Sequence, residues 1–186
     1  MRKLFSFNMM TLDGYIAGPD GDISWHNTDE EFGKFANEQT GTADLLLFGR
    51  VTYDLMASYW PTEDAIKDDP IVAGQMNRSP KIVFSRKMAR AEWNNTRVIK
   101  DHIGEEITKL KQQPGKDMAL FGSANLMQTL MQLDLIDEHR IMLNPVVLGQ
   151  GIPLFQGVRV PLKLKLVNTR TFRSGNTLLC YQPDRK

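Results

Sequence analysis

The stretch from Asp117 to Phe155 reads DMALFGSANLMQTLMQLDLIDEHRIMLNPVVLGQGIPLF, which is the pattern of a strand, a glycine turn, a helix and a second strand. An apolar run over 118–121 ends at Gly122-Ser123. Leucines and methionines then recur at gaps of three and four residues, which predicts a helix over 126–133. A strand that ends in glycine and opens a helix directs backbone N–H groups at one point, which suits an anion such as a phosphate. A tight strand-to-helix turn with no ligand requires the same residues.

The rest of the chain repeats this alternation of strands and helices. Apolar runs predict strands over 3–10, 15–17, 44–48, 81–86 and 96–99, and helical patterns follow from 28, from 49 to 60, over 71–77 and over 105–112. Two late strands, 162–172 and 176–182, are joined by a turn sequence and indicate a hairpin. The pattern predicts one α/β domain over residues 1–186, with a mostly parallel central sheet and a C-terminal antiparallel hairpin.

Local signals predict where the early helices begin and end. Thr28 is expected to cap the first helix, because Glu31 three residues later completes a capping box. Trp60-Pro61 is expected to end the second helix. The charged run 63–69 is expected to be a connector.

Composition excludes several classes of function. The net charge is +1, so no overall field draws the chain to nucleic acid or to a membrane. The single cysteine, Cys180, excludes an intramolecular disulfide and a cysteine-based zinc cluster. No apolar stretch approaches the roughly 20 residues of a membrane span, and the N-terminus has no cleavage signal. A cytoplasmic protein is therefore expected.

Three strands are followed by residues suited to phosphate. These segments are Gly49-Arg50-Val51-Thr52, Ser85-Arg86 and Gly122-Ser123. Ligands of open α/β sheets bind at the carboxyl ends of strands, and an arginine fork suits a 2′-phosphate or a pyrophosphate. The alternative is that Arg50 and Arg86 are solvated surface charges.

Acidic residues gather in the N-terminal part of the chain, at Asp13, Asp29, Glu30 and Glu31. A carboxyl group in an apolar cleft can hold or relay a proton. The alternatives are a turn residue for Asp13 and helix N-terminal charges for the two glutamates. The three histidines are scattered, without an HxxxH or HxH pair, so no metal site is expected.

Five segments and one tryptophan, in a fixed order, carry a resemblance to a known family. They are LDGYIAG at 12–18 with Trp25 after it, GRVTYD at 49–54, IVFSR at 82–86, LFGSANLMQTL at 120–130 and LIDEHRIMLNPVVLGQGIPLF at 135–155. Together they resemble the dihydrofolate-reductase-like superfamily, and in particular stand-alone relatives of the reductase domain of the bifunctional riboflavin-biosynthesis deaminase/reductase. The resemblance implies a three-layer α/β/α fold and a homodimer.

The resemblance also implies NADPH as hydride donor and a set of site residues. Matching positions make cofactor contacts of Gly49, Arg50, Thr52, Ser85, Arg86, Gly122, Ser123 and Ala124. Ile16 and Ala17 would border the nicotinamide. Trp25 would belong to the substrate loop, and Glu30 would be the substrate-binding carboxylate.

The expected function is an NADPH-dependent reductase of a pyrimidine- or pteridine-like heterocycle. The best-named activity is 5-amino-6-(5-phosphoribosylamino)uracil reductase of riboflavin biosynthesis. The alternatives are dihydrofolate reductase-type activity and a nucleotide-binding protein without turnover. The sequence departs from the pattern of the riboflavin reductases at three positions that bear on the choice of substrate. Phe7 replaces a lysine, Phe121 replaces an acid and Ser123 replaces the second of two glycines.

Two acids are candidates for the catalytic role. Glu30 is expected to orient the substrate and help supply its proton, with a pKa raised by its neighbours Trp25 and Phe32. Asp13 is the second candidate. Glu31 is expected to turn back to the backbone of Thr28 in the capping box.

Overall fold

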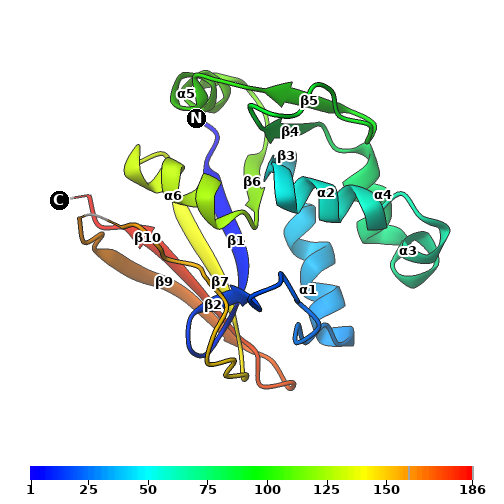
Figure 1. Ribbon diagram of the computed structural model, residues 1–186, viewed down its shortest axis with the longest axis vertical. Coiled ribbons are helices and arrows are strands. Elements are labelled where there is room, and N and C mark those ends of the chain that lie inside the picture. Colours follow the sequence, from blue (N-terminus) through cyan, green and yellow to red (C-terminus); the bar gives the residue numbers. More distant parts are fainter. Residues whose placement is uncertain (159, 186) are drawn as a thin grey trace.

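The computed structural model describes residues 1–158 and 160–185 and shows three layers, a central sheet with helices on both faces (Figure 1). The strands are β1 Leu4–Thr11, β2 Tyr15–Ala17, β3 Ala43–Gly49, β4 Lys81–Phe84, β5 Thr96–Ile99, β6 Asp117–Phe121, β7 Glu138–Asn144, β8 Ile152–Pro153, β9 Leu164–Thr171 and β10 Thr177–Pro183. The helices are α1 Glu30–Thr40, α2 Arg50–Tyr59, α3 Glu63–Asp68, α4 Pro70–Arg78, α5 Ile103–Gln112 and α6 Ala124–Gln132.

The large sheet has the order β5-β4-β3-β6-β1-β7-β10-β9. Strands β5 to β7 in this order run parallel, while β10 pairs antiparallel with both β7 and β9. The hairpin thus forms an antiparallel edge, which confirms the predicted fold class. A separate pair, β2 and β8, is also antiparallel.

Alternating side chains of the strands build one core on each face of the sheet. Phe5 and Phe7 of β1 belong to a cluster that includes Phe35 of α1 and Met76 of α4. Leu4 belongs to a second cluster with residues of α5 and α6. Because both faces are covered, the central strands β3, β4 and β6 contain continuous apolar runs, as buried parallel strands usually do.

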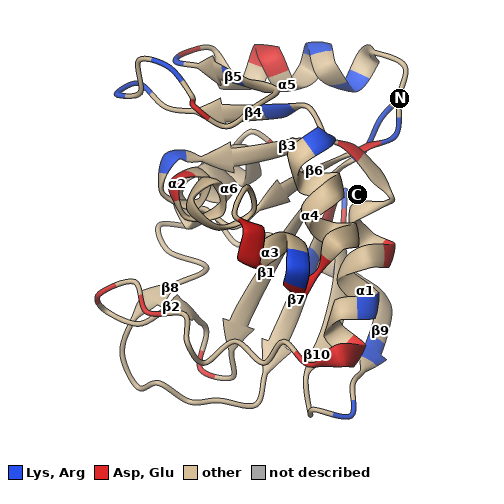
Figure 2. Cartoon of the chain, turned by 90° about the vertical axis from the view of Figure 1, so that its right-hand side faces the viewer, with Lys and Arg blue, Asp and Glu red and all other residues tan. Residues whose placement is uncertain are grey.

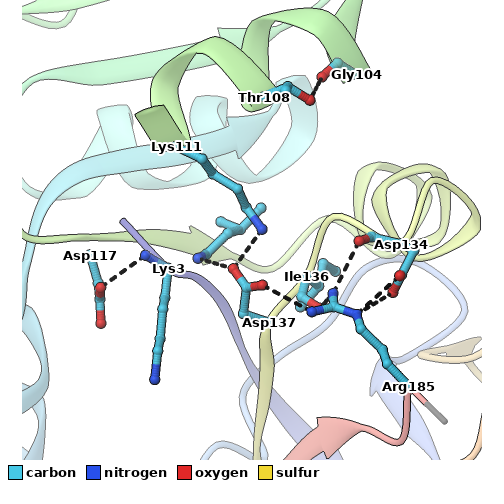
Figure 3. Close-up of polar contacts among 10 residues, drawn as sticks. Lys3, Gly104, Thr108, Lys111, Asp117, Asp134, Ile136, Asp137 and Arg185 are labelled. Atoms are coloured by element: carbon cyan, nitrogen blue, oxygen red, sulfur yellow. Dashed lines mark hydrogen bonds and ion pairs between the residues drawn. The ribbon is translucent and has the colours of Figure 1, made fainter. Parts of the chain in front are cut away.

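Polar contacts tie the chain ends together at the edge of the sheet where β1 and β7 begin (Figure 3). Asp137 accepts from the Lys111 ammonium at 2.6 Å and from the Leu4 amide at 2.8 Å. Arg185 donates to Asp134 at 3.0 Å. These contacts lie at the amino ends of the parallel strands, so they stabilise the fold at the edge opposite to the candidate site.

Two local predictions were wrong. Asp29, rather than Thr28, caps α1, because its carboxylate accepts from the Phe32 amide at 2.8 Å. The charged run 63–69 is mostly helical, since Thr62 caps a short helix, α3, at 3.2 Å from the Ala65 amide. The predicted end of the second helix is confirmed, because α2 ends at Tyr59.

Candidate active site

Two glycine turns meet at the carboxyl edge of the sheet. Strands β3 and β6 are parallel neighbours, with Leu47 opposite Leu120, so Gly49 at the end of β3 and Gly122 just after β6 lie at the same edge. A Cβ atom on Gly49 would overlap the side chain of Ser123. A Cβ atom on Gly122 would lie 2.9 Å from the hydroxyl of Thr52. Glycine at both positions is therefore required by close packing between the turns.

The two helices that follow these turns lack side-chain caps. In the described part of the chain, neither Gly49 before α2 nor Ser123 before α6 makes a capping side-chain hydrogen bond, in contrast to Asp29 before α1. Gly122 and Ser123 both adopt left-handed backbone conformations, with φ of 59° and 56°. Two helix N-termini without side-chain acceptors meet at one edge, an arrangement that favours a bound anion.

The two predicted arginines lie at the ends of β3 and β4. Arg50 opens α2 and forms an ion pair with Asp54 at 2.8 Å. Arg86 is 85% exposed and lies 3.5 Å from Asp101, which follows β5. The hydroxyl oxygen of Ser85 accepts from the Met88 amide at 3.1 Å. Because both arginines are paired only at the surface, they remain available to a phosphate.

Ile16 and Ala17 lie on β2, which pairs with β8 beside the end of β1. Asp13 fastens this region, because its carboxylate accepts from the Gly149 amide at 2.7 Å and from the Thr11 hydroxyl at 2.6 Å. The Thr11 hydrogen bond is the main cause that lowers the pKa of Asp13. Asp13 is therefore a charged anchor of the 146–149 loop.

Three asparagines that sequence reasoning missed hold the loop around Trp25. The amide of Asn27 donates to the side chain of Asn144 at 3.1 Å, and Asn176 donates to the Asn27 carbonyl at 2.8 Å. Asn144 and Asn176 are fully buried at the end of β7 and the start of β10. The only signal in the sequence was an asparagine that ends an apolar run, at Asn144.

Two side chains in the tryptophan loop have buried polar atoms without a hydrogen-bond partner among the described residues, Trp25 at Nε1 and His26 at Nε2. The two rings meet edge to face at 4.5 Å. Burial lowers the pKa of His26 to about 4. His26 is therefore neutral near pH 7, and Trp25 offers a free donor.

Glu30 differs from its prediction. Its side chain is 86% exposed and lies 2.7 Å from the Lys34 ammonium. The hydrogen bond from Lys34 lowers the pKa of Glu30, so the expected rise through burial was wrong. Glu30 is a carboxylate at neutral pH.

The predicted role of Glu31 in a capping box was also wrong. Its carboxylate accepts from the Arg173 amide at 2.9 Å and lies 3.6 Å from the Arg170 guanidinium. Glu31 therefore joins α1 to the β9–β10 hairpin. Among the described residues, Glu30 is therefore left with a single ion pair, to a lysine on its own helix.

Aromatic rings occupy Phe7 and Phe121, two positions at which the sequence departs from the family resemblance. The ring centres of Phe7 and Phe121 lie 6.2 Å apart. Phe121 also stacks on Phe48, with 6.2 Å between the ring centres. Phe7 also contacts Phe35 of α1 at 5.8 Å. This part of the sheet is therefore apolar.

In the view of Figure 2, basic and acidic residues alternate along the chain and neither sign is confined to one element. Among the residues that the structure describes, no group of three or more histidine, cysteine, aspartate and glutamate side chains is placed to hold a metal ion. Over the same residues, no helix has the length and apolar character needed to cross a bilayer.

The topology and the paired glycine turns define a dihydrofolate-reductase-like fold. A dihydrofolate reductase from Enterococcus faecalis complexed with NADP(H) superposes with a TM-score of 0.67 at 16% identity, over 98% of this chain and 96% of that one. A putative riboflavin biosynthesis protein from Shewanella sp. PV-4 gives a TM-score of 0.75 at 24% identity, over 98% of this chain and 99% of that one.

Sequence similarity shows the family. Residues 2–178 match the family described as the RibD C-terminal domain, and the chain belongs to this family. It is 40% identical over 182 residues to YyaP of Bacillus subtilis, covering 97% of this chain and 94% of YyaP. It is 32% identical over 179 residues to YwjB of the same organism, covering 92% of each. The family is the reductase domain of RibD, and the chain is therefore a RibD-like reductase by fold and family.

Proposed function

We propose that the protein is an NADPH-dependent reductase of a pyrimidine- or pteridine-like heterocycle. The observation that carries the proposal is the meeting of two glycine turns at two helix N-termini without side-chain caps. A pyrophosphate fits this arrangement, because it needs close approach to backbone N–H groups and a positive dipole end.

The residues around the turns fit the remaining parts of the cofactor. Gly49, Arg50, Thr52, Gly122, Ser123 and Ala124 would hold the phosphates, Ser85 and Arg86 the 2′-phosphate, and Ile16 and Ala17 the nicotinamide. When bound, NADPH supplies a hydride. The chain itself positions the acceptor and excludes water with the aromatic residues beside β1.

Glu30 and Trp25 would orient the substrate. A charged carboxylate can accept from paired ring N–H donors, and the Trp25 Nε1 group can donate to a carbonyl or to an ordered water. The lowered pKa of Glu30 makes it a poor source of the proton that must follow the hydride. The remaining acid, Asp13, is engaged by the 146–149 loop, so water near Trp25 is the better source.

The family resemblance implies 5-amino-6-(5-phosphoribosylamino)uracil as the best-named substrate and a homodimer as the assembly. The composition favours a cytoplasmic location. Phe7 and Phe121 are apolar and lie side by side, where the resemblance implies a lysine and an acid. This departure concerns the particular substrate and leaves the assignment to the reductase class unchanged. Dihydrofolate reductase-type activity is the second candidate, because the fold likeness extends to the enzyme from Enterococcus faecalis.

Titration of the intrinsic tryptophan fluorescence with NADPH and NADH tests the cofactor. We expect NADPH to bind about tenfold to a hundredfold more tightly, since a charge-assisted contact to the 2′-phosphate is worth roughly 1.5–3 kcal/mol. Arg86→Ala should remove most of this preference. Arg90→Ala is the matched control, because Arg90 is also exposed and paired with an acid, Glu92.

Equal affinities for the two cofactors, unchanged in Arg86→Ala, would contradict the cofactor assignment. Oxidation of NADPH with a panel of pyrimidines and pteridines then tests turnover. NADPH binding without oxidation of the cofactor by any of these compounds would favour a nucleotide-binding protein on this scaffold.

A further inference from the structure

The strand β2 lies beside the ends of β1 and β7, at the carboxyl edge of the sheet (Figure 1). Thr11, the last residue of β1, pairs with Asn144, the last residue of β7, so the loops after these two strands leave the sheet together. Strand β1 also pairs with β6, which leads to Gly122. The loop that carries β2 is therefore the next one along the edge from the second glycine turn.

The pair of β2 and β8 is too short to hold its own position. Strand β2 has three residues and β8 has two, and the register between them is irregular. Even a complete two-stranded hairpin is only marginally stable in water. Gly151 lies close to β2, because a Cβ atom there would overlap the carbonyl oxygen of Ala17. Contacts outside the pair must therefore help to fix where Ile16 and Ala17 lie.

Asp13 supplies such contacts from the turn between β1 and β2. Its carboxylate accepts from the Gly149 amide at 2.7 Å and from the Leu148 amide at 3.2 Å. In the described part of the chain, no other side chain of residues 12–17 hydrogen-bonds to the segment 145–153. The side chain of Asp13 thus joins the loop that carries β2 to the loop that carries β8.

Asp13 also determines how the hydroxyl of Thr11 is used. The Thr11 hydroxyl donates to the Asp13 carboxylate at 2.6 Å. A hydroxyl has one proton and two lone pairs, so its oxygen is then left to accept. It accepts from the amide of Tyr15, the first residue of β2, at 3.0 Å. One carboxylate therefore fixes both the start of β2 and the loop before β8.

These contacts require a carboxylate at residue 13. The partners of Asp13 are two amides and a hydroxyl, which all donate, and an ionised carboxylate only accepts. The Thr11 hydrogen bond lowers the pKa of Asp13, so the carboxylate is charged at neutral pH. Asparagine has the same shape but carries an NH₂ group in place of one oxygen, and this group would face a donor.

We propose that Asp13 is a positioning residue for the nicotinamide half of the cofactor. Its carboxylate holds β2 against the 146–149 loop, so that Ile16 and Ala17 are in place before NADPH binds. In the proposed function, on which this role of Asp13 rests, these two residues border the nicotinamide. A wall that is fixed in advance strengthens binding, because less freedom is lost when the ligand arrives.

Calorimetric titration with NADPH and with adenosine 2′,5′-bisphosphate tests this role. The second compound contains the 2′-phosphate half of the cofactor and lacks the nicotinamide. Asp13→Asn keeps the size of the side chain and removes one acceptor oxygen. Asp117→Asn is the matched control. Asp117 also accepts from the amide of a distant residue, Lys3 at 3.0 Å, but at the opposite edge of the sheet (Figure 3).

We expect Asp13→Asn to bind adenosine 2′,5′-bisphosphate as tightly as the wild type does. Its affinity for NADPH should fall about tenfold, the effect of β2 being in place in about a tenth of the molecules. Asp117→Asn should bind both compounds as the wild type does. In the unliganded proteins, hydrogen exchange over 12–18 and 146–154 should be faster in Asp13→Asn and unchanged in Asp117→Asn.

Circular dichroism establishes that each variant is folded. If Asp13→Asn does not fold, Thr11→Val decides. This substitution removes the hydroxyl and keeps the branched shape, so the Tyr15 amide loses its acceptor. The same selective loss of NADPH affinity is then expected.

Wild-type affinity for NADPH in Asp13→Asn would overturn the proposal, and so would an equal loss of affinity for both compounds. Unchanged hydrogen exchange over 12–18 would overturn it as well. In each of these cases the wild type still binds NADPH, so the cofactor assignment would stand. A wild type that binds neither compound would refute the cofactor assignment itself, and with it a nicotinamide beside β2.

Discussion

Two adjacent glutamates show how the role of a residue depends on its immediate neighbours. Glu31 is held between the Arg173 amide and the Arg170 guanidinium, so it connects α1 to the hairpin. Glu30 is one position earlier and points to solvent, where its ion pair with Lys34 spans one helical turn. Only Glu30 can exchange its partner for a ligand without breaking a contact between elements.

Glu30→Gln keeps the size of the side chain and removes its charge. We expect kcat/KM for the heterocycle to fall by about tenfold to a hundredfold, because charge-assisted hydrogen bonds to the ring would be lost. NADPH affinity should stay unchanged in the fluorescence titration. Glu31→Gln is the control and should lower the free energy of unfolding by about 1 kcal/mol. Unchanged kcat/KM in Glu30→Gln on a verified substrate would exclude Glu30.

At the scale of elements, the starts of the helices fall into two kinds. Helices α1, α3 and α4 begin with side-chain caps from Asp29, Thr62 and Asp69. Helices α2, α5 and α6 begin without a capping side chain in the described structure, and of these α2 and α6 follow the two glycine turns. A side-chain cap stabilises the start of a helix, whereas an uncapped start leaves N–H groups without an acceptor from a side chain.

The cap of α1 can be tested by a pair of alanine substitutions. Asp29→Ala should lower the free energy of unfolding by about 1 kcal/mol, because the Phe32 amide loses its acceptor. Thr28→Ala should change it by less than about 0.5 kcal/mol, as an exposed substitution. Urea denaturation measures both. A larger effect from Thr28→Ala than from Asp29→Ala would instead indicate that Thr28 caps α1.

The contact between the glycine turns predicts a rescue. Gly49→Ala should destabilise the protein by about 1–3 kcal/mol, because the new methyl group overlaps the Ser123 side chain. Ser123→Gly removes that side chain, and it also relieves a left-handed φ of 56°. The double variant should therefore recover most of the lost stability in urea denaturation. Failure of Ser123→Gly to rescue Gly49→Ala would show that the turns do not pack as described.

At the scale of the whole molecule, the sheet encloses a histidine far from the candidate site. His139 is 1% exposed, and its Nδ1 atom lies 3.1 Å from the Ser6 hydroxyl. Its Nε2 atom has no hydrogen-bond partner among the described residues. Burial lowers the pKa of His139 to about 4.

This histidine predicts acid sensitivity of the fold. In the unfolded chain its pKa is about 6.5, so between pH 6.5 and 4 the unfolded state binds more protons. The contribution of neutral His139 to the free energy of unfolding is fully present above pH 6.5. It is lost as the pH falls from 6.5 through 4, by at most about 3 kcal/mol. Urea denaturation at several pH values should show a shallower dependence in His139→Gln. The same slope in both proteins would contradict the assignment.

Local patterns in the sequence predicted the architecture and the position of the two glycine turns. Strand composition, helical spacing and glycine turns act over a few residues, so they predicted the α/β order and the closing hairpin. The two glycine turns were expected at one edge because carboxyl ends of parallel strands point the same way. The contact between Gly49 and Ser123 is consistent with that reasoning.

Tertiary structure alone decided the surroundings of Trp25, the exposure of Glu30 and the two faces of the C-terminal strands. The asparagine bonds around Trp25 join residues 117 and 149 positions apart, and no local pattern links such positions. The solvent exposure of Glu30 depends on where α1 lies against the hairpin. The side chains that share a face of β7, β10 and β9 are known only from the register of these strands, since a shift of one residue would move every side chain to the other face.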